Sequence, residues 1–338
     1  MKHTRQFPAP DPSRPRRSTS AMIASFVAEG QKTRLAPFGH ALVALARERP
    51  AIVGMTADLS KYTDLYVFAQ AFPERFYQMG MAEQLLMGAA AGMAREGFIP
   101  FATTYAVFAS RRAYDFICMA IAEESLPVKI VCALPGLTTG YGPSHQATDD
   151  LAIMRAMPNL TVIDPCDALE IEQAVSVIAD HPGPVYMRLL RGQVPLVLDD
   201  YNYRFQLGKA AMLREGREVL FISSGLMTMR ALEAAKALEA DAIGCAVLHV
   251  ATLKPLDEAA ILAAAAKPGR LVVVAENHSV IGGLGEAVAA ALMRAGLHPA
   301  FRQIALPDAF LDAGALPTLH DRYGISTEAI CSQIKGWL

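Results

Sequence analysis

Short runs of apolar residues alternate with longer segments in which apolar residues recur every three or four positions, from about Ser25 onward. The short runs are typical of buried strands and the longer segments of amphipathic helices. This alternation predicts an α/β protein in which helices cover both faces of doubly wound, largely parallel sheets. The expected strands are 51–55, 128–133, 160–163, 185–189, 218–223, 243–249, 271–275 and 300–304. The expected helices of the first half are 35–49, 65–72, 82–95, 107–123, 148–156 and 167–180.

The same pattern divides the chain into segments of different kinds. With 338 residues the chain exceeds one comfortable hydrophobic core, which favours two domains of about 150 residues each. Residues 31–192 form the first expected domain, and 213–338 form a smaller second one. Residues 193–212 carry few helical signals and are interpreted as a linker. Residues 1–30 begin with an Arg- and Pro-rich stretch, whose prolines interrupt the amphipathic helix of a targeting peptide, so we expect a flexible N-terminal arm.

Composition narrows the range of partners and of compartments. Hydrophobic residues make up 53% of the chain and its formal net charge is −2, which argues against nucleic acid or an anionic membrane as a partner. The longest apolar runs, such as Leu271–Ala275, are far shorter than the about 20 residues of a membrane-spanning helix. Five cysteines without C-x-x-C spacing indicate reduced thiols, and therefore a cytoplasmic protein.

The first candidate for chemistry is Glu83, which lies at the start of an expected helix rich in Gly and Ala. Small residues allow a neighbouring backbone to approach closely, as a tight interface requires. A carboxyl group buried among Met and Leu has a raised pKa and can share a proton with a ring nitrogen. A glutamate in the first turn of a helix is also favourable for the helix dipole alone, so both interpretations stand on the pattern.

Two further segments carry aromatic and proton-transferring side chains. Tyr105 and Phe108 lie three residues apart at the mouth of a helix, where they could stack on a flat ligand or belong to the core. His145 ends a loop that follows a strand, in the run Gly142-Pro-Ser-His-Gln146. Ligands of open α/β sheets bind in such loops, which makes His145 a candidate proton carrier, with a structural histidine as the alternative.

Charged residues also follow expected strands. Arg188 and Arg191, at the end of the strand 185–189, could hold an anionic substrate group through their guanidinium forks. Asp58 follows the strand 51–55 and is a candidate ligand group. The alternatives are solvated arginines and an aspartate that forms a turn.

These segments, in this order, resemble the C-terminal half of transketolases from about Lys32 to Leu338. The resemblance implies a pyrimidine-binding domain that contributes to a thiamine diphosphate site, followed by a transketolase C-terminal domain. It assigns Glu83 to the glutamate that bonds the aminopyrimidine and starts catalysis, and it assigns Tyr105 and Phe108 to the rings that pack on the pyrimidine. By the same resemblance Asp58 lies near the cofactor and His145 contacts the donor sugar. Arg34 and Arg191 match the positions of arginines that bind the substrate phosphate in the family.

The sequence also departs from the family pattern. Tyr141 stands where the family usually has an acidic residue that contacts a sugar hydroxyl. This departure suggests an unusual or branched ketose phosphate as the donor. Around residues 57–63 and 139–142 the chain is similar to the small subunits of transketolases that act on apulose 4-phosphate. The chain contains no Gly-Asp-Gly with a downstream Asn, the motif that holds the diphosphate and Mg²⁺. The resemblance therefore implies a split enzyme, with an α2β2 assembly in which an N-terminal-half partner subunit ligates the magnesium.

Two rival functions remain open on the sequence. The β subunit of a 2-oxoacid dehydrogenase E1 shares the fold and the glutamate but differs in its histidine loop. A scaffold subunit without catalytic residues is the other rival. Retention of Glu83, Tyr105, Phe108 and His145 favours a catalytic transferase that moves a two-carbon ketol unit from a ketose phosphate to an aldose phosphate.

Overall fold

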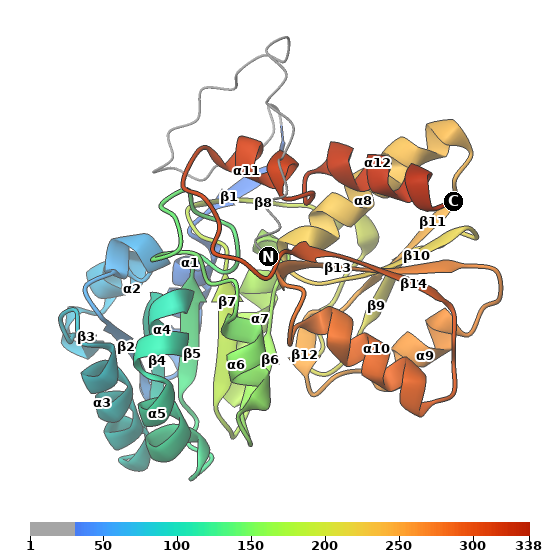
Figure 1. The fold of residues 1–338 in the computed structure, drawn as a ribbon. Helices are drawn as coiled ribbons and strands as arrows, with labels where there is room; N and C mark the ends of the chain where they lie inside the picture. Colours follow the sequence, from blue (N-terminus) through green and yellow to red (C-terminus); the bar gives the residue numbers. More distant parts are fainter. Residues whose placement is uncertain (1–30) are drawn as a thin grey trace, which may run out of the picture.

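The computed structural model describes residues 31–338; the expected N-terminal arm, residues 1–30, lies outside the described residues. Two sheets stand side by side, each covered by helices on both faces, which confirms the predicted α/β fold class (Figure 1). No helix within residues 31–338 combines the length and apolar character needed to span a bilayer.

The first sheet has seven strands in the order β12-β6-β7-β5-β4-β2-β3. All its pairings are parallel except that of β12 with β6. Its strands are β2 (Ile52–Thr56), β3 (Phe76–Gln78), β4 (Ile99–Tyr105), β5 (Lys129–Ala133), β6 (Thr161–Ile163), β7 (Val185–Leu189) and β12 (Thr252–Lys254). Because β12 comes from the second half of the chain, this pairing ties the two halves together.

Each face of the first sheet has its own helices and its own core. One face carries α1 (Pro37–Glu48), α2 (Tyr66–Ala71) and α7 (Ala168–Asp180). The other carries α3 (Glu83–Arg95), α4 (Ala106–Arg112), α5 (Tyr114–Phe116), a π-helical turn at Ile117–Ala122 and α6 (Asp150–Ala156). The single helix expected over 107–123 is thus broken at Ala113. The other expected helices are present, with ends shifted by one or two residues.

The second sheet has five strands in the order β14-β13-β10-β11-β9, and β9 is the antiparallel one. Its strands are β9 (Ala211–Arg214), β10 (Val219–Ser223), β11 (Cys245–His249), β13 (Leu271–Ser279) and β14 (Ala300–Leu306). Its helices are α8 (Leu226–Leu238), α9 (Glu258–Ala265), α10 (Leu284–Arg294), α11 (Leu316–Arg322) and α12 (Thr327–Trp337). Helices α8 and α12 lie on one face of this sheet, and α9 and α10 lie on the other (Figure 1).

Two short strands complete the structure. β1 (Thr33–Leu35) pairs antiparallel with β8 (Gln193–Pro195), so the segment after β7 returns to the beginning of the described chain. The hydrophobic core on the α3 side of the first sheet continues without a break into the α9 and α10 side of the second. The two sheets therefore share buried surface, which fixes how loops from one half meet residues of the other.

Candidate functional site

The predicted site residues gather at one edge of the first sheet. β2, β4, β5 and β7 run parallel, so their carboxyl ends lie along the same edge. Asp58 follows β2, Tyr105 ends β4, the loop with His145 follows β5, and Arg191 follows β7. This edge is where open α/β sheets bind ligands.

Four aromatic side chains form a cluster there, called the ring cluster below: Tyr105, Phe108, Tyr141 and His145. The Tyr105 and Phe108 ring centroids are 5.5 Å apart. The His145 ring lies 6.0 Å from Tyr105, 5.4 Å from Phe108 and 5.2 Å from Tyr141. Tyr105 is buried, whereas Tyr141 is 42% exposed. The cluster thus has a closed end at the sheet and an open end at Tyr141.

His145 is a neutral imidazole near pH 7. Burial and the neighbouring Arg112 guanidinium both lower the pKa of His145 from its usual 6.5. Its Nδ1 lies 2.9 Å from the Ser144 hydroxyl oxygen, which fixes the orientation of the ring. A neutral, oriented imidazole can both donate and accept a hydrogen bond, as contact with a sugar hydroxyl requires.

Glu83 is the first residue of α3 and is 4% exposed. Arg112 Nη1 lies 3.3 Å from Glu83 Oε1, and the Arg112 guanidinium lies 3.9 Å from the centroid of the Phe108 ring. Among residues 31–338 the Glu83 side chain makes no hydrogen bond to the backbone of its own helix, so the helix-start interpretation rests on the dipole alone. Arg112 connects Glu83 to the ring cluster, and the sequence analysis did not single it out.

Asp58 occupies a tight turn beside this region. Its φ is +59°, a conformation that aspartate tolerates better than most residues. The Asp58 N–H donates to Gln78 Oε1 at 2.7 Å, and Gln78 Nε2 donates to Asp58 Oδ1 at 3.1 Å. Gln78 Oε1 also accepts from the Gly80 N–H at 3.1 Å. Gln78 therefore links the Asp58 turn to the segment that leads into Glu83.

Arg191 brings a positive charge to the same edge. Its guanidinium lies 5.6 Å from the Tyr62 ring centroid. Burial raises the pKa of Tyr105, and the positive charge of Arg191 offsets part of that rise. Nearby, Asp64 accepts from the Gly192 N–H at 2.9 Å, and burial raises the pKa of Asp64 to about 6. The buried Nε of Arg191 has no hydrogen-bond partner within residues 31–338. This unpaired buried donor makes Arg191 a candidate for binding an anionic group.

Two predicted arginines have other partners. Arg34 lies in β1 and forms an ion pair with Glu172 of α7, so it is not in contact with the ring cluster. Arg188 is 1% exposed and binds Asp150, Asp164 and the Asn277 carbonyl oxygen. The prediction that Arg188 holds an anionic substrate group is wrong, because two buried carboxylates already neutralise its guanidinium.

The second half of the chain holds the loop that carries His145. The Leu137 N–H donates to Asn277 Oδ1 at 2.8 Å, and His320 Nε2 donates to the Leu137 carbonyl oxygen at 2.8 Å. Further along the loop, Gln146 Nε2 donates to the Asp312 carbonyl oxygen at 3.1 Å. These bonds position the loop from outside the first sheet, so the second half contributes to the site without carrying its rings.

Other polar clusters lead to different conclusions. Among residues 31–338, Cys166, Glu170 and His249 are close enough to hold a metal ion. The Glu170 carboxylate, however, already accepts from His249 Nε2, the Tyr203 hydroxyl and the Cys166 N–H, which makes this group a buried hydrogen-bond network between the two halves. The network occupies the acceptor positions that a metal would need.

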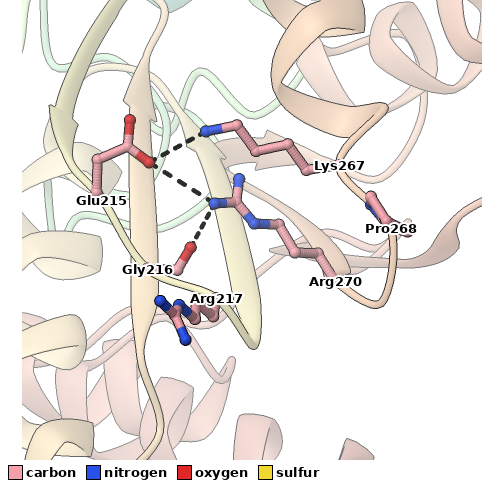
Figure 2. A pocket seen from close by; sticks show the side chains of 6 residues that line it. All are labelled: Glu215, Gly216, Arg217, Lys267, Pro268 and Arg270. Carbon is pink, nitrogen blue, oxygen red and sulfur yellow. Dashed lines mark hydrogen bonds and ion pairs between the residues drawn. The ribbon is translucent and has the colours of Figure 1, made fainter.

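A cavity of about 640 Å³ lies away from the site, at the amino ends of β10 and β13 (Figure 2). Its lining includes three cations, Arg217, Lys267 and Arg270. Glu215 pairs with Lys267 at 3.2 Å and with Arg270 at 3.7 Å. One carboxylate thus satisfies two of the three cations, and none of the predicted site residues lines this cavity.

Comparison with known proteins places this chain in a family. Residues 31–197 match the family model described as transketolase, pyrimidine binding domain, and residues 208–330 match the transketolase C-terminal domain. A transketolase family protein of Sinorhizobium fredii is 73% identical over 96% of this chain and 94% of its own length. A 6-deoxy-6-sulfo-D-fructose transketolase subunit of Clostridium sp. strain MSTE9 is 40% identical over 86% of this chain and 89% of its own length.

One solved structure and one further sequence relative agree with this result. One described as a split gene transketolase, inactive beta4 tetramer, is 43% identical, covers 89% of this chain and 96% of its own, and has a TM-score of 0.80. A 1-deoxy-D-xylulose-5-phosphate synthase of Syntrophotalea carbinolica is 34% identical over 89% of this chain, but the match covers only 47% of the synthase. The chain thus spans about half the length of that relative.

This chain belongs to the transketolase family. Within that family it groups with the subunits of split transketolases, as the sequence analysis predicted. The family consists of transferases that use thiamine diphosphate with a metal ion. The residues that the sequence analysis missed are Arg112, Gln78 and Asp64. Arg112 follows Phe108 by four residues on a helix, and this spacing is the signal that could have drawn attention to it.

Proposed function

We propose that this chain is the small subunit of a thiamine-diphosphate-dependent transketolase, active only with a partner subunit. The reaction moves a two-carbon ketol unit from a ketose phosphate to an aldose phosphate such as glyceraldehyde 3-phosphate. The observation that carries the proposal is a buried carboxylate, Glu83, beside the ring cluster at the carboxyl edge of the sheet.

The residues present fit the pyrimidine end of thiamine diphosphate. Tyr105 and Phe108 offer aromatic faces to a flat ring, and Glu83 offers a carboxylate oxygen to a ring nitrogen in a place shielded from water. The cofactor, when bound, supplies the carbanion chemistry of ketol transfer. The part of Glu83 is to hold a proton at Oε and exchange it with the ring nitrogen. Asp58 and Gln78 fix the turn that leads to Glu83.

The open end of the ring cluster suits the donor sugar. His145 and the exposed Tyr141 present hydrogen-bonding groups there, and Arg191 offers its unused Nε–H to an anionic group. Arg34 would have to leave Glu172 to reach a phosphate. Tyrosine in place of an acidic residue favours a less usual donor, for which apulose 4-phosphate is our candidate. The relative named for 6-deoxy-6-sulfo-D-fructose supports an anionic ketose as the class of donor.

An exposed apolar face supports a subunit partner. Met81 is 82% exposed, Leu85 55%, Met119 53% and Phe116 42%. Leu85 lies on α3 and Met81 just before that helix, while Phe116 and Met119 lie on the neighbouring α5 and π-helical turn. Gly92, on the same helix, has open space where a side chain would stand. We call these residues the α3 face. A cluster of apolar side chains of this kind is typical of a protein interface.

We assign the α3 face to the N-terminal-half subunit, which would ligate Mg²⁺ and hold the diphosphate in an α2β2 assembly. This assignment agrees with the lack of a Gly-Asp-Gly motif in the chain. The solved relative described as an inactive tetramer of β chains supports the need for a second kind of subunit.

Substitution of Glu83 by Gln tests the proposal. The change keeps size and hydrogen bonding but removes the exchangeable carboxyl proton, so we expect kcat for ketol transfer in the two-subunit mixture to fall at least about 100-fold. Glu96→Gln, at the exposed far end of the same helix, is the control and should retain the rate. An unchanged rate in Glu83→Gln would refute the catalytic role. Activity with pyruvate instead of ketose phosphates would favour the dehydrogenase alternative.

A further inference from the structure

Arg112 contacts two of the side chains that, in the proposed function, bind the cofactor. It is the last residue of α4, four residues after Phe108. Its guanidinium lies 3.9 Å from the centroid of the Phe108 ring, and its Nη1 lies 3.3 Å from Glu83 Oε1. The Arg112 side chain is 53% exposed and that of Glu83 is 5% exposed, so the cation reaches a buried carboxylate from the solvent side.

A guanidinium and an aminopyrimidine compete for such a place because they share two properties. Both are flat and rich in nitrogen, and both can stack on an aromatic ring while directing nitrogen at a carboxylate in their own plane. One face of Phe108 and one oxygen of Glu83 cannot serve both groups at once.

We propose, on the basis of the proposed function, that Arg112 occupies the pyrimidine subsite in the free subunit. Its side chain must move out of this subsite before the cofactor binds. Arg112 is thereby a determinant of cofactor affinity that this subunit contributes. The subunit would keep its cofactor half-site filled until the cofactor displaces the side chain.

The contacts of Arg112 are weak enough to be displaced. Its neighbour Arg111 is held in place by a bidentate pair with Asp149, at 2.9 and 3.0 Å, and by the Pro143 carbonyl oxygen. The contacts recorded for Arg112 within residues 31–338 are one ion pair and one ring contact. An ion pair whose cation is half-exposed, together with a cation–π contact, should weaken the binding of a competing ligand by roughly tenfold.

The test measures binding of the pyrimidine alone, because the free chain lacks the diphosphate half of the site. The probe is 4-amino-5-hydroxymethyl-2-methylpyrimidine, titrated into the purified full-length chain by calorimetry or ligand-observed NMR. Removal of the competitor in Arg112→Ala should tighten binding by roughly tenfold. Arg95→Ala is the matched control: it removes a similarly exposed arginine whose partner is Glu124, and it should bind like the wild type.

A double variant separates this inference from the proposed function. Glu83→Gln combined with Arg112→Ala should lose the gain in affinity, since the carboxylate that the pyrimidine would bond is then gone. Equal affinity in the wild type and Arg112→Ala, with weaker binding in Glu83→Gln alone, would overturn the inference and leave the pyrimidine site standing. No binding by an Arg112→Ala chain with a wild-type unfolding midpoint would also overturn it. The proposed function is judged separately, by the rate of Glu83→Gln in the two-subunit mixture.

Discussion

His320 should make the fold sensitive to acid, because the imidazole is buried in its neutral form. It is 2% exposed and its Nε2 donates to the Leu137 carbonyl oxygen, at the start of the loop that carries His145. Burial lowers the pKa of His320 to about 4. In the unfolded chain a histidine takes up a proton near pH 6.5. Between these values the unfolded state binds more protons, so the free energy of unfolding falls as the pH falls.

The size of the effect follows from the two pKa values. Between pH 7 and pH 5 the unfolded histidine becomes almost fully protonated while the folded one stays neutral, which removes about 2 kcal/mol from the free energy of unfolding. Other groups act in the opposite direction: burial raises the pKa of Asp64 to about 6, and a carboxyl with a raised pKa stabilises the fold as the pH falls toward it. A comparison of variants at two pH values cancels these other groups.

The assay is urea unfolding at pH 7 and pH 5, followed by the fluorescence of the single tryptophan, Trp337. His320→Gln keeps an N–H for Leu137 but cannot titrate. Relative to the wild type, it should gain about 2 kcal/mol between pH 7 and pH 5. Leu319→Ala, a neighbouring core variant, costs roughly 2–5 kcal/mol and should show the same loss at both pH values. A difference between His320→Gln and the wild type that does not change with pH would refute the reasoning.

Three further substitutions test other parts of the account. Leu85→Arg puts a charge on the α3 face and should weaken association with the partner subunit at least about tenfold, as measured by native mass spectrometry. The unfolding midpoint should stay unchanged. Association as strong as that of the wild type would mean that the interface lies elsewhere. Arg188→Met leaves two buried carboxylates unpaired and should cost about 3–5 kcal/mol in urea unfolding, and a loss under 1 kcal/mol would contradict this. Gly136→Ala would place a Cβ 2.1 Å from the Asn277 carbonyl oxygen, at a φ of +56°, and should lower the unfolding midpoint and the ketol-transfer rate together; a wild-type rate would show that the loop position is not critical.

The pattern of apolar residues was sufficient to predict most of the parallel strands but missed β4, which lies between β2 and β5 near the middle of the first sheet. Pro100 and the pair Thr103-Thr104 interrupt the apolar run that marks a buried strand. In the structure the Thr103 hydroxyl meets the Thr63 hydroxyl at 2.9 Å, from a segment forty residues away. Periodicity does not reveal such a partner, so the strand was interpreted only as an aromatic segment leading into a helix.

The site shows the same division between local and distant information. His145 was recognisable because its loop follows an expected strand, and parallel strands bring their carboxyl ends together. Tyr105 and Phe108 were singled out only as aromatic residues at the mouth of an expected helix. Arg188 looked equally suited to an anion, and only the fold brings Asp150 and Asp164 to it. The contacts made by Asn277 and His320 with the histidine loop join positions more than a hundred residues apart, which no local pattern encodes.

The most direct test of the central claim is ketol transfer by the purified chain, alone and mixed with a subunit that carries the diphosphate and magnesium motif. Donors should include several ketose phosphates, among them the branched apulose 4-phosphate, with glyceraldehyde 3-phosphate as acceptor and with thiamine diphosphate and Mg²⁺ present. The account predicts transfer only in the mixture, together with formation of a complex of both subunits. Transfer by this chain alone, or a stable complex that is inactive with every ketose phosphate, would contradict it.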